Sequence, residues 1–183
     1  MEKRITLVFG QEGTGKTHLV KKLTSREQRL FITDHNREYE NGVIFERYLD
    51  LESYLLHARP SKFKVICRFQ TTVDYDALVQ LVKKVDDCTL LAEECQFVAP
   101  VTLSKLDPFL DLIRYGRHTS TSIVGVSQSA SEVAKDLRRQ ARHVITFRQV
   151  DPDDLAALKK RGFDPAVIAA LKDREFVEKK YGG

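Results

Sequence analysis

The sequence predicts an α/β fold with a mainly parallel central sheet flanked by helices. Along the 183-residue chain, apolar runs rich in β-branched and aromatic residues alternate with segments of helical period. This order is typical of strands joined by crossover helices. Three of the apolar runs end at Gly10, at Glu93-Glu94 and at Gln128. Because parallel strands present their carboxyl ends at one edge of a sheet, the sequence predicts a ligand site at that edge.

A glycine-rich loop follows the first apolar run and matches the phosphate-binding motif G-x-x-x-x-G-K-[ST]. Its four fixed positions are Gly10, Gly15, Lys16 and Thr17. A strand-like run precedes the loop and an amphipathic segment follows it, which is the context that the motif requires. The glycines let successive backbone N–H groups point at a polyphosphate, and the new helix adds the positive end of its dipole. We therefore expect ATP and Mg²⁺ as cofactors.

The residues of this loop have separate expected roles. Lys16 is expected to reach the β- and γ-phosphates, and the Thr17 hydroxyl is expected to hold Mg²⁺. His18 either contacts the nucleotide or is only a polar residue of the following helix. The residues expected to bind the nucleotide are Gly10, Gln11, Glu12, Gly13, Thr14, Gly15, Lys16, Thr17 and His18.

The composition is that of one globular domain. Hydrophobic residues make up 42% of the chain and the formal net charge is +4, which permits a nucleic-acid partner without requiring one. The three cysteines form no C-x-x-C motif and no Cys/His cluster, so we expect reduced thiols rather than disulfides or zinc. Residues 1–150 are expected to form the nucleotide-binding core, and residues 151–183 a small helical extension.

Neither a signal peptide nor a transmembrane segment is expected. The charged residues 1–4 lead directly into the first apolar run, without the hydrophobic stretch of a signal peptide. No uncharged run approaches the roughly twenty apolar residues that cross a bilayer. We therefore expect a soluble, cytoplasmic protein.

The segment after the loop continues the alternation of helices and strands. Residues 18–23 carry an apolar face opposite two lysines and predict a short helix. Residues 29–34 predict a buried strand that ends at Asp34, which either contacts a ribose or a metal or, as we favour, caps the following turn. Residues 42–46 predict a short strand, and residues 49–58 a helix that ends before a proline.

The next strand pair leads to two acidic residues. Residues 63–69 predict a strand, and residues 74–85 a helix with its apolar side chains on one face. The strand at residues 88–94 ends in Glu93 and Glu94. Opposite a phosphate-binding loop, we expect Glu93 to hold the Mg²⁺ shell and Glu94 to take a proton from the attacking water. The alternative is a solvated acidic pair at a strand end.

The remaining elements complete the predicted sheet. Residues 96–106 predict a loop, and residues 108–115 predict a helix. Residues 122–128 predict a strand that ends at Gln128. Gln128 either orients the attacking water or caps the next helix. Residues 131–140 predict a helix with a basic outer face. The last predicted elements are a strand at 144–147, two helices started by Asp-Pro pairs within 151–171, and a strand at 175–178.

The order of these motifs resembles the FtsK–HerA superfamily of DNA-pumping P-loop ATPases, which have a RecA-like fold. The resemblance is carried by the phosphate-binding loop, by Leu-Leu-Ala-Glu-Glu at 90–94, by Arg-Tyr-Gly-Arg-His at 114–118 and by Ile-Val-Gly-Val-Ser-Gln at 123–128. Residues 136–148 are similar to the segment that follows the glutamine in HerA-type members. Glu93 stands where these families usually have Asp, and Ser129 follows the glutamine where many have Arg-Pro.

The resemblance implies a ring, expected to be a homo-hexamer, with ATP at each subunit boundary. A neighbouring subunit would supply an arginine finger, and the candidates are Arg142 and Arg117, with Arg148 behind them; each could instead be a surface arginine. Double-stranded DNA would pass through the pore by non-specific backbone contacts. The contacting loop is unidentified, either residues 96–106 with Lys105 or the turn at 35–41 with Arg37.

The length of the chain narrows the resemblance to the small genome-packaging ATPases of tailless, membrane-containing double-stranded DNA viruses. The expected partner is then a capsid or membrane vertex protein, and the location is the host cytoplasm or the virion vertex. The alternatives are a DNA pump of conjugation or chromosome type, a small nucleoside or metabolite kinase, and a nucleotide-binding switch without turnover.

Overall fold

The computed structural model describes residues 4–99, 107–115 and 120–182, with only the backbone of Tyr115. Its strands are β1 (Ile5–Phe9), β2 (Arg29–Thr33), β3 (Val43–Phe45), β4 (Phe63–Cys67), β5 (Thr89–Ala92), β6 (Ser122–Ser127), β7 (His143–Thr146) and β8 (Val177–Lys180). Its helices are α1 (Lys16–Leu23), α2 (Tyr48–Ala58), α3 (Thr72–Lys84), α4 (Pro108–Tyr115), α5 (Lys135–Gln140), α6 (Pro152–Lys159) and α7 (Pro165–Ala169). A 3₁₀ turn, η1 (Cys95–Phe97), follows β5.

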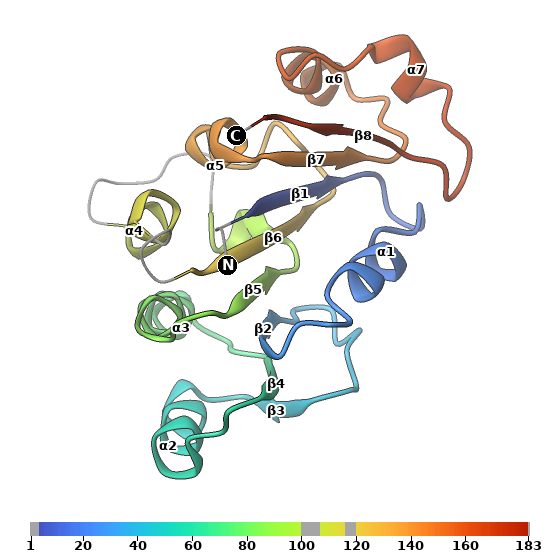
Figure 1. The fold of residues 1–183 in the computed structure, drawn as a ribbon. Coiled ribbons are helices and arrows are strands. Elements are labelled where there is room, and N and C mark those ends of the chain that lie inside the picture. Colours follow the sequence, from blue (N-terminus) through green and yellow to red (C-terminus); the bar gives the residue numbers. More distant parts are fainter. Residues whose placement is uncertain (1–3, 100–106, 116–119, 183) are drawn as a thin grey trace.

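The described strands form a single sheet in the order β3-β4-β2-β5-β6-β1-β7-β8 (Figure 1). Every neighbouring pair is parallel except β7 and β8, which are antiparallel. The predicted α/β fold with a mainly parallel sheet is therefore confirmed.

Helices cover both faces of the sheet. The helices α2, α3, α4 and α5 pack against one another along one face, and α1 lies on the other (Figure 1). Alternate residues of each strand serve the two layers: Leu7 and Phe31 belong to the core under α3 to α5, whereas Val8 and Ile32 belong to the core under α1. Strands buried on both faces read as continuous apolar runs, which is why the sequence pattern identified them.

The parallel register brings four strand ends to one edge. Phe9 of β1 is paired with Ser127 of β6, and Ala92 of β5 is paired with both Thr33 of β2 and Gly125 of β6. The residues that follow these strands are therefore neighbours in space although they are far apart in sequence. This register brings the residues after β1, β5 and β6 together at the edge of the sheet for which a single site was predicted.

The C-terminal segment continues the same sheet. Asp151 caps α6 by accepting hydrogen bonds from the backbone N–H groups of Asp153 and Asp154, and Asp164 caps α7 by accepting one from that of Ala166. A proline occupies the start of each helix. The prediction that Asp-Pro pairs start two helices is confirmed, because both side-chain capping and the fixed proline φ favour a helix start. After α7 the chain returns as β8 beside β7.

The predicted helix at residues 131–140 is wrong at its start, since α5 begins only at Lys135. Asp154, which is 4% exposed, accepts hydrogen bonds from the Ser129 hydroxyl at 2.7 Å and from the Ser131 backbone N–H at 2.8 Å. These bonds from α6 hold the chain before α5 in a non-helical conformation. A contact with a segment more than twenty residues away thus overrides the local helical pattern.

A buried ion pair holds the loop that follows β2. The Asp34 carboxylate accepts hydrogen bonds from the backbone N–H groups of Glu38 at 2.8 Å and Tyr39 at 3.3 Å, and from Arg68 Nε at 2.9 Å. Arg68 Nη2 also donates to the Tyr39 carbonyl oxygen at 2.6 Å. Asp34 therefore caps this loop, the interpretation that the sequence favoured, and the loop places Asn36 and Glu38 at the carboxyl edge of the sheet.

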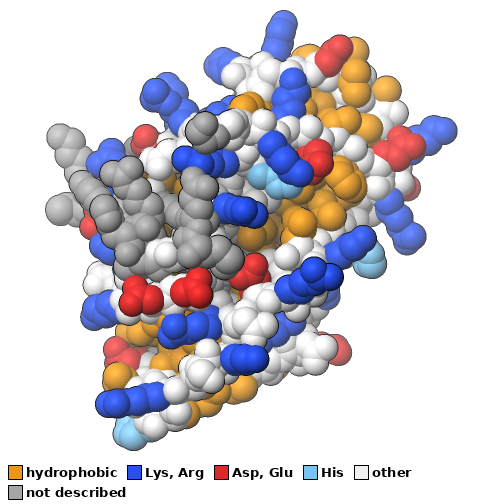
Figure 2. Space-filling view, in the orientation of Figure 1, with side chains coloured by type: hydrophobic (Ala, Val, Ile, Leu, Met, Phe, Trp, Pro, Cys, Tyr) orange, Lys and Arg blue, Asp and Glu red, His pale blue; other side chains and the backbone are white. Residues whose placement is uncertain are grey.

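The viewed surface carries mixed charge. Lysine and arginine side chains are spread over much of this face, with acidic and apolar side chains among them (Figure 2). Within the described ranges, no helix combines the length and the apolar composition needed to cross a membrane.

We expect Arg68→Ala to destabilise the fold far more than Arg37→Ala. Removing Arg68 leaves the Asp34 carboxylate, only 1% exposed, without its cation, which should lower the free energy of unfolding by roughly 2–4 kcal/mol. Arg37 belongs to the same loop, but its ion pair with Glu46 is 63% exposed on both sides, so its loss should cost less than about 0.5 kcal/mol. Urea unfolding of both variants measures the difference, and equal losses would contradict the role given to Asp34.

Candidate active site

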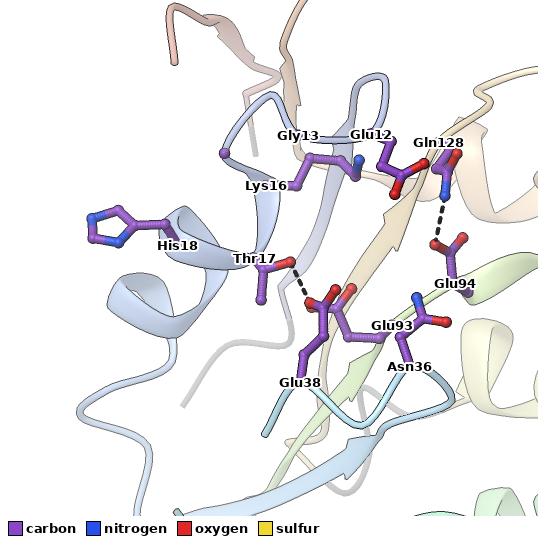
Figure 3. A pocket seen from close by; sticks show the side chains of 11 residues that line it. Glu12, Gly13, Lys16, Thr17, His18, Asn36, Glu38, Glu93, Glu94 and Gln128 are labelled. Atoms are coloured by element: carbon purple, nitrogen blue, oxygen red, sulfur yellow. Dashed lines mark hydrogen bonds between the residues drawn. The ribbon is translucent and has the colours of Figure 1, made fainter. Parts of the chain in front are cut away.

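A cavity of about 710 Å³ lies at the carboxyl edge of the sheet (Figure 3). One wall is the glycine-rich loop with the start of α1, and the opposite wall carries residues that follow β2, β5 and β6. The side chains of that opposite wall are Asn36, Glu38, Glu93, Glu94 and Gln128. The predicted phosphate-binding loop and the predicted catalytic residues of β5 and β6 thus face one cavity.

The loop has the backbone that the motif demands. Gly15 caps α1 with a φ of 102°, in the left-handed region that favours glycine. Gly10 has no room for a side chain, because a Cβ there would lie 2.6 Å from Cβ of Phe147. The Thr14 hydroxyl closes the turn by donating to the Gln11 carbonyl oxygen at 2.7 Å. The start of α1 lines the cavity, and backbone N–H groups at a helix start can bind an anion.

Lys16 is a buried cation at the base of this loop. Its ammonium donates to the carbonyl oxygens of Gly10 at 2.7 Å and Gln11 at 2.9 Å. Burial lowers the pKa of Lys16, while Glu94 and Glu93 across the cavity raise it. Lys16 is thus the positive charge of the cavity, and nucleotide phosphates would replace the carbonyl oxygens as its partners.

The Thr17 hydroxyl faces a carboxylate that the sequence did not suggest. It donates to Glu38 Oε2 at 2.7 Å (Figure 3). The only sequence signal for Glu38 was its place in the polar turn after the second strand. Among the described residues no group of three or more His, Cys, Asp or Glu side chains forms a metal cage, but Mg²⁺ commonly uses one or two protein oxygens together with water and phosphate oxygens. Thr17 with Glu38 fits that ligand set.

Glu93 is held in a buried polar contact. It is 8% exposed, and the Tyr39 hydroxyl donates a hydrogen bond to its carboxyl group. Burial raises the pKa of Glu93 to about 7, although the bond from Tyr39 lowers it. Burial and the neighbouring Glu93 also raise the pKa of Tyr39, which keeps its hydroxyl a donor. A metal role for Glu93 stays a prediction.

Glu94 is fixed by two amides. Gln128 Nε2 donates to one carboxylate oxygen at 3.1 Å (Figure 3), and Gln96 Nε2 donates to the other at 2.8 Å. Glu94 has a φ of 48°, a left-handed conformation rare outside glycine. Behind the pair, the buried Gln149 donates to the Gln128 carbonyl oxygen at 2.6 Å. Sequence reasoning missed this contact of Gln149 with the backbone of Gln128. A carboxylate held in this way can orient and deprotonate a water molecule.

His18 lies at the rim of the site, and its side chain points away from the phosphate cavity (Figure 3). It is exposed on the outer surface of α1. Glu12 also lines the cavity, near Gln128. Whether either residue binds nucleotide stays a prediction.

Of the candidate arginine fingers, neither Arg142 nor Arg148 lines this cavity. Arg142 precedes β7 and so lies at the opposite edge of the sheet, where it lines a separate cavity of about 470 Å³ with Arg4 and Lys180. Arg117 and Lys105 lie outside the described residues. Arg148 is exposed just after β7, and its carbonyl oxygen accepts from the Gln11 backbone N–H at 3.3 Å.

Comparison with known proteins gives structural neighbours only. No protein-family model matches the chain, and no curated protein matches its sequence. Among solved structures, the chain is similar to the genome packaging NTPase B204 from Sulfolobus turreted icosahedral virus 2 in complex with ATP-gammaS, with a TM-score of 0.77 and 19% identity. That match covers 97% of this chain and 92% of the viral chain.

Two further structures share the fold. VirB4 of Thermoanaerobacter pseudethanolicus matches with a TM-score of 0.62 and 11% identity, over 97% of this chain and 89% of that chain. The N-terminal domain of zonular occludens toxin from Neisseria meningitidis matches with a TM-score of 0.58 and 15% identity, over 100% and 95% of the two chains. The likeness to B204 and VirB4 confirms the predicted fold, which this chain shares with the genome packaging NTPase B204.

We expect Glu93→Gln to change how stability depends on pH. A carboxyl group with a pKa of about 7 in the folded chain and near 4.5 in the unfolded chain favours folding while protonated, and this advantage is lost as the pH rises from about 4.5 to about 7. The glutamine amide imitates the protonated form at every pH. In a chelator-containing buffer, the variant should therefore gain roughly 1–3 kcal/mol relative to the unmodified chain between pH 5 and pH 8.

Urea unfolding at several pH values measures this difference. Glu27→Gln is a suitable control, because Glu27 is another carboxylate that accepts a hydroxyl hydrogen bond, from Thr89 at 2.7 Å. The control measures what replacing such a hydrogen-bonded carboxylate by an amide does to the free energy of unfolding at each pH. If the free energies of unfolding of the Glu93 variant and the unmodified chain differ by the same amount at every pH, the raised pKa of the buried Glu93 carboxyl group is contradicted.

Proposed function

We propose that this chain is an ATP-hydrolysing motor that moves double-stranded DNA and packages a viral genome into a capsid. The observation that carries the hydrolytic part is the Glu94–Gln128 pair, which faces the cavity opposite Lys16 and Thr17. One side of the cavity offers phosphate-binding groups, and the other offers a positioned carboxylate. This is the arrangement that hydrolysis of a phosphoanhydride requires.

The residues divide the chemistry between them. The N–H groups at the start of α1 and the Lys16 ammonium bind the β- and γ-phosphates and offset their charge. Thr17 and Glu38 would hold Mg²⁺, which would supply positive charge to neutralise the charge that develops on the phosphates. Glu94 accepts the proton of the attacking water, and Gln128 keeps Glu94 and the water in line with the γ-phosphate. Glu93, when ionised, adds a second carboxylate beside the metal.

The DNA-packaging part is supported by the likeness to B204. That protein is described as a genome packaging NTPase and, in a second virus, as a DNA-packaging ATPase. The match extends over more than nine-tenths of both chains, so the likeness is not confined to one part of this chain. The partners on this hypothesis are double-stranded DNA, bound through its backbone, and a capsid or membrane vertex protein.

In a ring of identical subunits, Arg142 would act at the nucleotide site of a neighbouring subunit. Arg142 lies at the opposite edge of the sheet from Glu94, so within one subunit the two cannot meet at the γ-phosphate. In a head-to-tail ring the amino edge of one subunit can approach the carboxyl edge of the next. Arg142 would then stabilise the charge that develops on the γ-phosphate of the neighbour.

The first test is ATP hydrolysis by the purified chain. Lys16→Ala should lower the rate at least about 100-fold by removing the phosphate cation. Glu94→Gln should keep ATP binding and lose about 100-fold or more of the turnover rate. Lys84→Ala, an exposed lysine on the far side of the sheet, is the control and should hydrolyse ATP normally. Loss of ATP binding in Glu94→Gln would contradict the proposal that Glu94 acts as the general base.

The same assay tests the DNA motor. Double-stranded DNA of any sequence should raise the hydrolysis rate, and the stimulation should weaken as salt increases, because backbone contacts release counterions. If DNA does not change the hydrolysis rate and the protein stays monomeric with nucleotide and DNA present, the DNA-motor hypothesis is excluded. The proposed hydrolytic site would not be contradicted by that result.

Mixing inactive variants tests the shared site. We expect Arg142→Ala and Lys16→Ala to be inactive alone and to regain activity when mixed in equal amounts. In random mixed rings roughly a quarter of the boundaries join an intact Lys16 to an intact Arg142. Arg139→Ala, an exposed arginine on α5, should be active alone. Activity of Arg142→Ala by itself, or a mixture without any recovery, would argue against a finger at this position.

A further inference from the structure

The backbone of Gln128 is held by a residue that follows β7. The Gln128 side chain donates to Glu94 at 3.1 Å (Figure 3), and the Gln128 carbonyl oxygen accepts a hydrogen bond from Gln149 Nε2 at 2.6 Å. Gln149 is 1% exposed, so this bond lies in the protein interior. The direction in which the Gln128 side chain leaves the backbone therefore depends on what holds its neighbours.

A second contact fixes the residue after Gln128. The Ser129 hydroxyl donates to Asp154 Oδ1 at 2.7 Å, and the same oxygen accepts from the Ser131 backbone N–H at 2.8 Å. Ser127 and Ser129 are also bonded to each other: the Ser127 hydroxyl donates to the Ser129 carbonyl oxygen at 2.9 Å, and the Ser129 backbone N–H donates to the Ser127 hydroxyl at 3.2 Å. One carboxylate of α6 therefore holds the turn that carries Gln128.

Asp154 is a buried carboxylate in the first turn of α6. It is 4% exposed, and its negative charge acts on Arg138 of α5. Burial lowers the pKa of Arg138, while Asp154 raises it. A buried carboxylate that loses a hydrogen-bond donor is destabilised, so the folded chain favours the bond to Ser129. The position of Ser129 is thus tied to that of α6.

The Ser129–Asp154 contact borders the proposed site of hydrolysis. A cavity of about 780 Å³ shares Glu12 and Gln128 with the phosphate cavity and is also lined by Ser129 and Asp154. Gln128 therefore borders both cavities. A small shift of the turn at Ser129 would move the amide that donates to Glu94.

We propose that Asp154 is a positioning residue for Gln128 and, through it, for Glu94. Its bond to Ser129 directs the Gln128 amide at the Glu94 carboxylate. The inference rests on the proposed function, since it assigns Gln128 and Glu94 to hydrolysis. Ser129 stands where many members of the resembled superfamily have arginine, which has no hydroxyl, so this contact follows from the sequence of this chain. The C-terminal segment would thereby control turnover from outside the phosphate cavity.

Steady-state ATP hydrolysis by the full chain tests the proposal. Asp154→Ala should lower kcat about tenfold, because a slightly displaced group no longer supports the reacting geometry. KM and the calorimetric affinity for ATP should stay within about twofold of the unmodified values, since the phosphate-binding residues are unchanged. Asp154→Asn keeps an oxygen acceptor for Ser129 and should retain most of kcat. A residue needed only for folding would not separate turnover from binding in this way.

Coupling to Gln128 distinguishes positioning from a general effect on the chain. Gln128→Ala should lower kcat about tenfold or more. In a chain that already carries Gln128→Ala, Asp154→Ala should cause no further loss of kcat. Ser129→Ala should reproduce the loss seen in Asp154→Ala. Because Ser129→Ala leaves Asp154 its bond from Ser131, it carries the same test if urea unfolding shows that Asp154→Ala does not fold.

Asp153→Ala is the matched control. Asp153 is an exposed carboxylate in the same turn of α6, and it lines the same cavity. This variant removes one negative charge beside Gln128 without removing the acceptor of the Ser129 hydroxyl. It should hydrolyse ATP at the rate of the unmodified chain.

The outcomes separate the two hypotheses. If Asp154→Ala and Ser129→Ala keep the unmodified kcat while Gln128→Ala loses it, the positioning role is overturned and the proposed hydrolytic site stands. If Asp154→Ala lowers kcat by the same factor with and without Gln128→Ala, or if Asp153→Ala loses as much, the positioning role is also overturned. If the unmodified chain does not hydrolyse ATP, the proposed function and this inference both fail.

Discussion

The structure depends on the register of its parallel strands. β1, β2, β5 and β6 end at the same edge because their hydrogen-bonded partners are aligned residue for residue. A shift of one residue in a strand would turn its side chains to the opposite face of the sheet. The apolar side chains on both faces prevent such a shift, since each alternate set is buried under a helix layer. The core therefore fixes the relative positions of the groups that we propose to be catalytic.

The second determinant is the balance of charge around Lys16. One cation lies between the glycine-rich loop and the carboxylates of Glu38, Glu93 and Glu94. Each carboxylate accepts hydrogen bonds from different donors. The Thr17 hydroxyl donates to Glu38, the Tyr39 hydroxyl donates to Glu93, and two glutamine amides donate to Glu94. A cavity with this excess of acid favours a metal ion together with a nucleotide, because a nucleotide alone would add to the negative charge.

Much of the fold and part of the site could be predicted from local sequence. The buried strands read as apolar runs, the Asp-Pro pairs set the starts of α6 and α7, and the motif at Gly10 to Thr17 identified the loop. These signals are encoded within a few neighbouring residues. The start of α5 was not predictable, since the bonds that delay it come from Asp154 on a later helix.

By itself the sequence determined that a glycine-rich loop with the phosphate-binding motif follows the first strand and that Glu93, Glu94 and Gln128 follow others. Only the tertiary structure decided what those groups contact. The Thr17–Glu38 bond joins residues 21 positions apart, and the Tyr39–Glu93 bond joins residues 54 positions apart. The approach of Arg174 to Gly15 spans most of the chain. No local pattern records such pairs, because they arise when burial of apolar surface brings separate segments together.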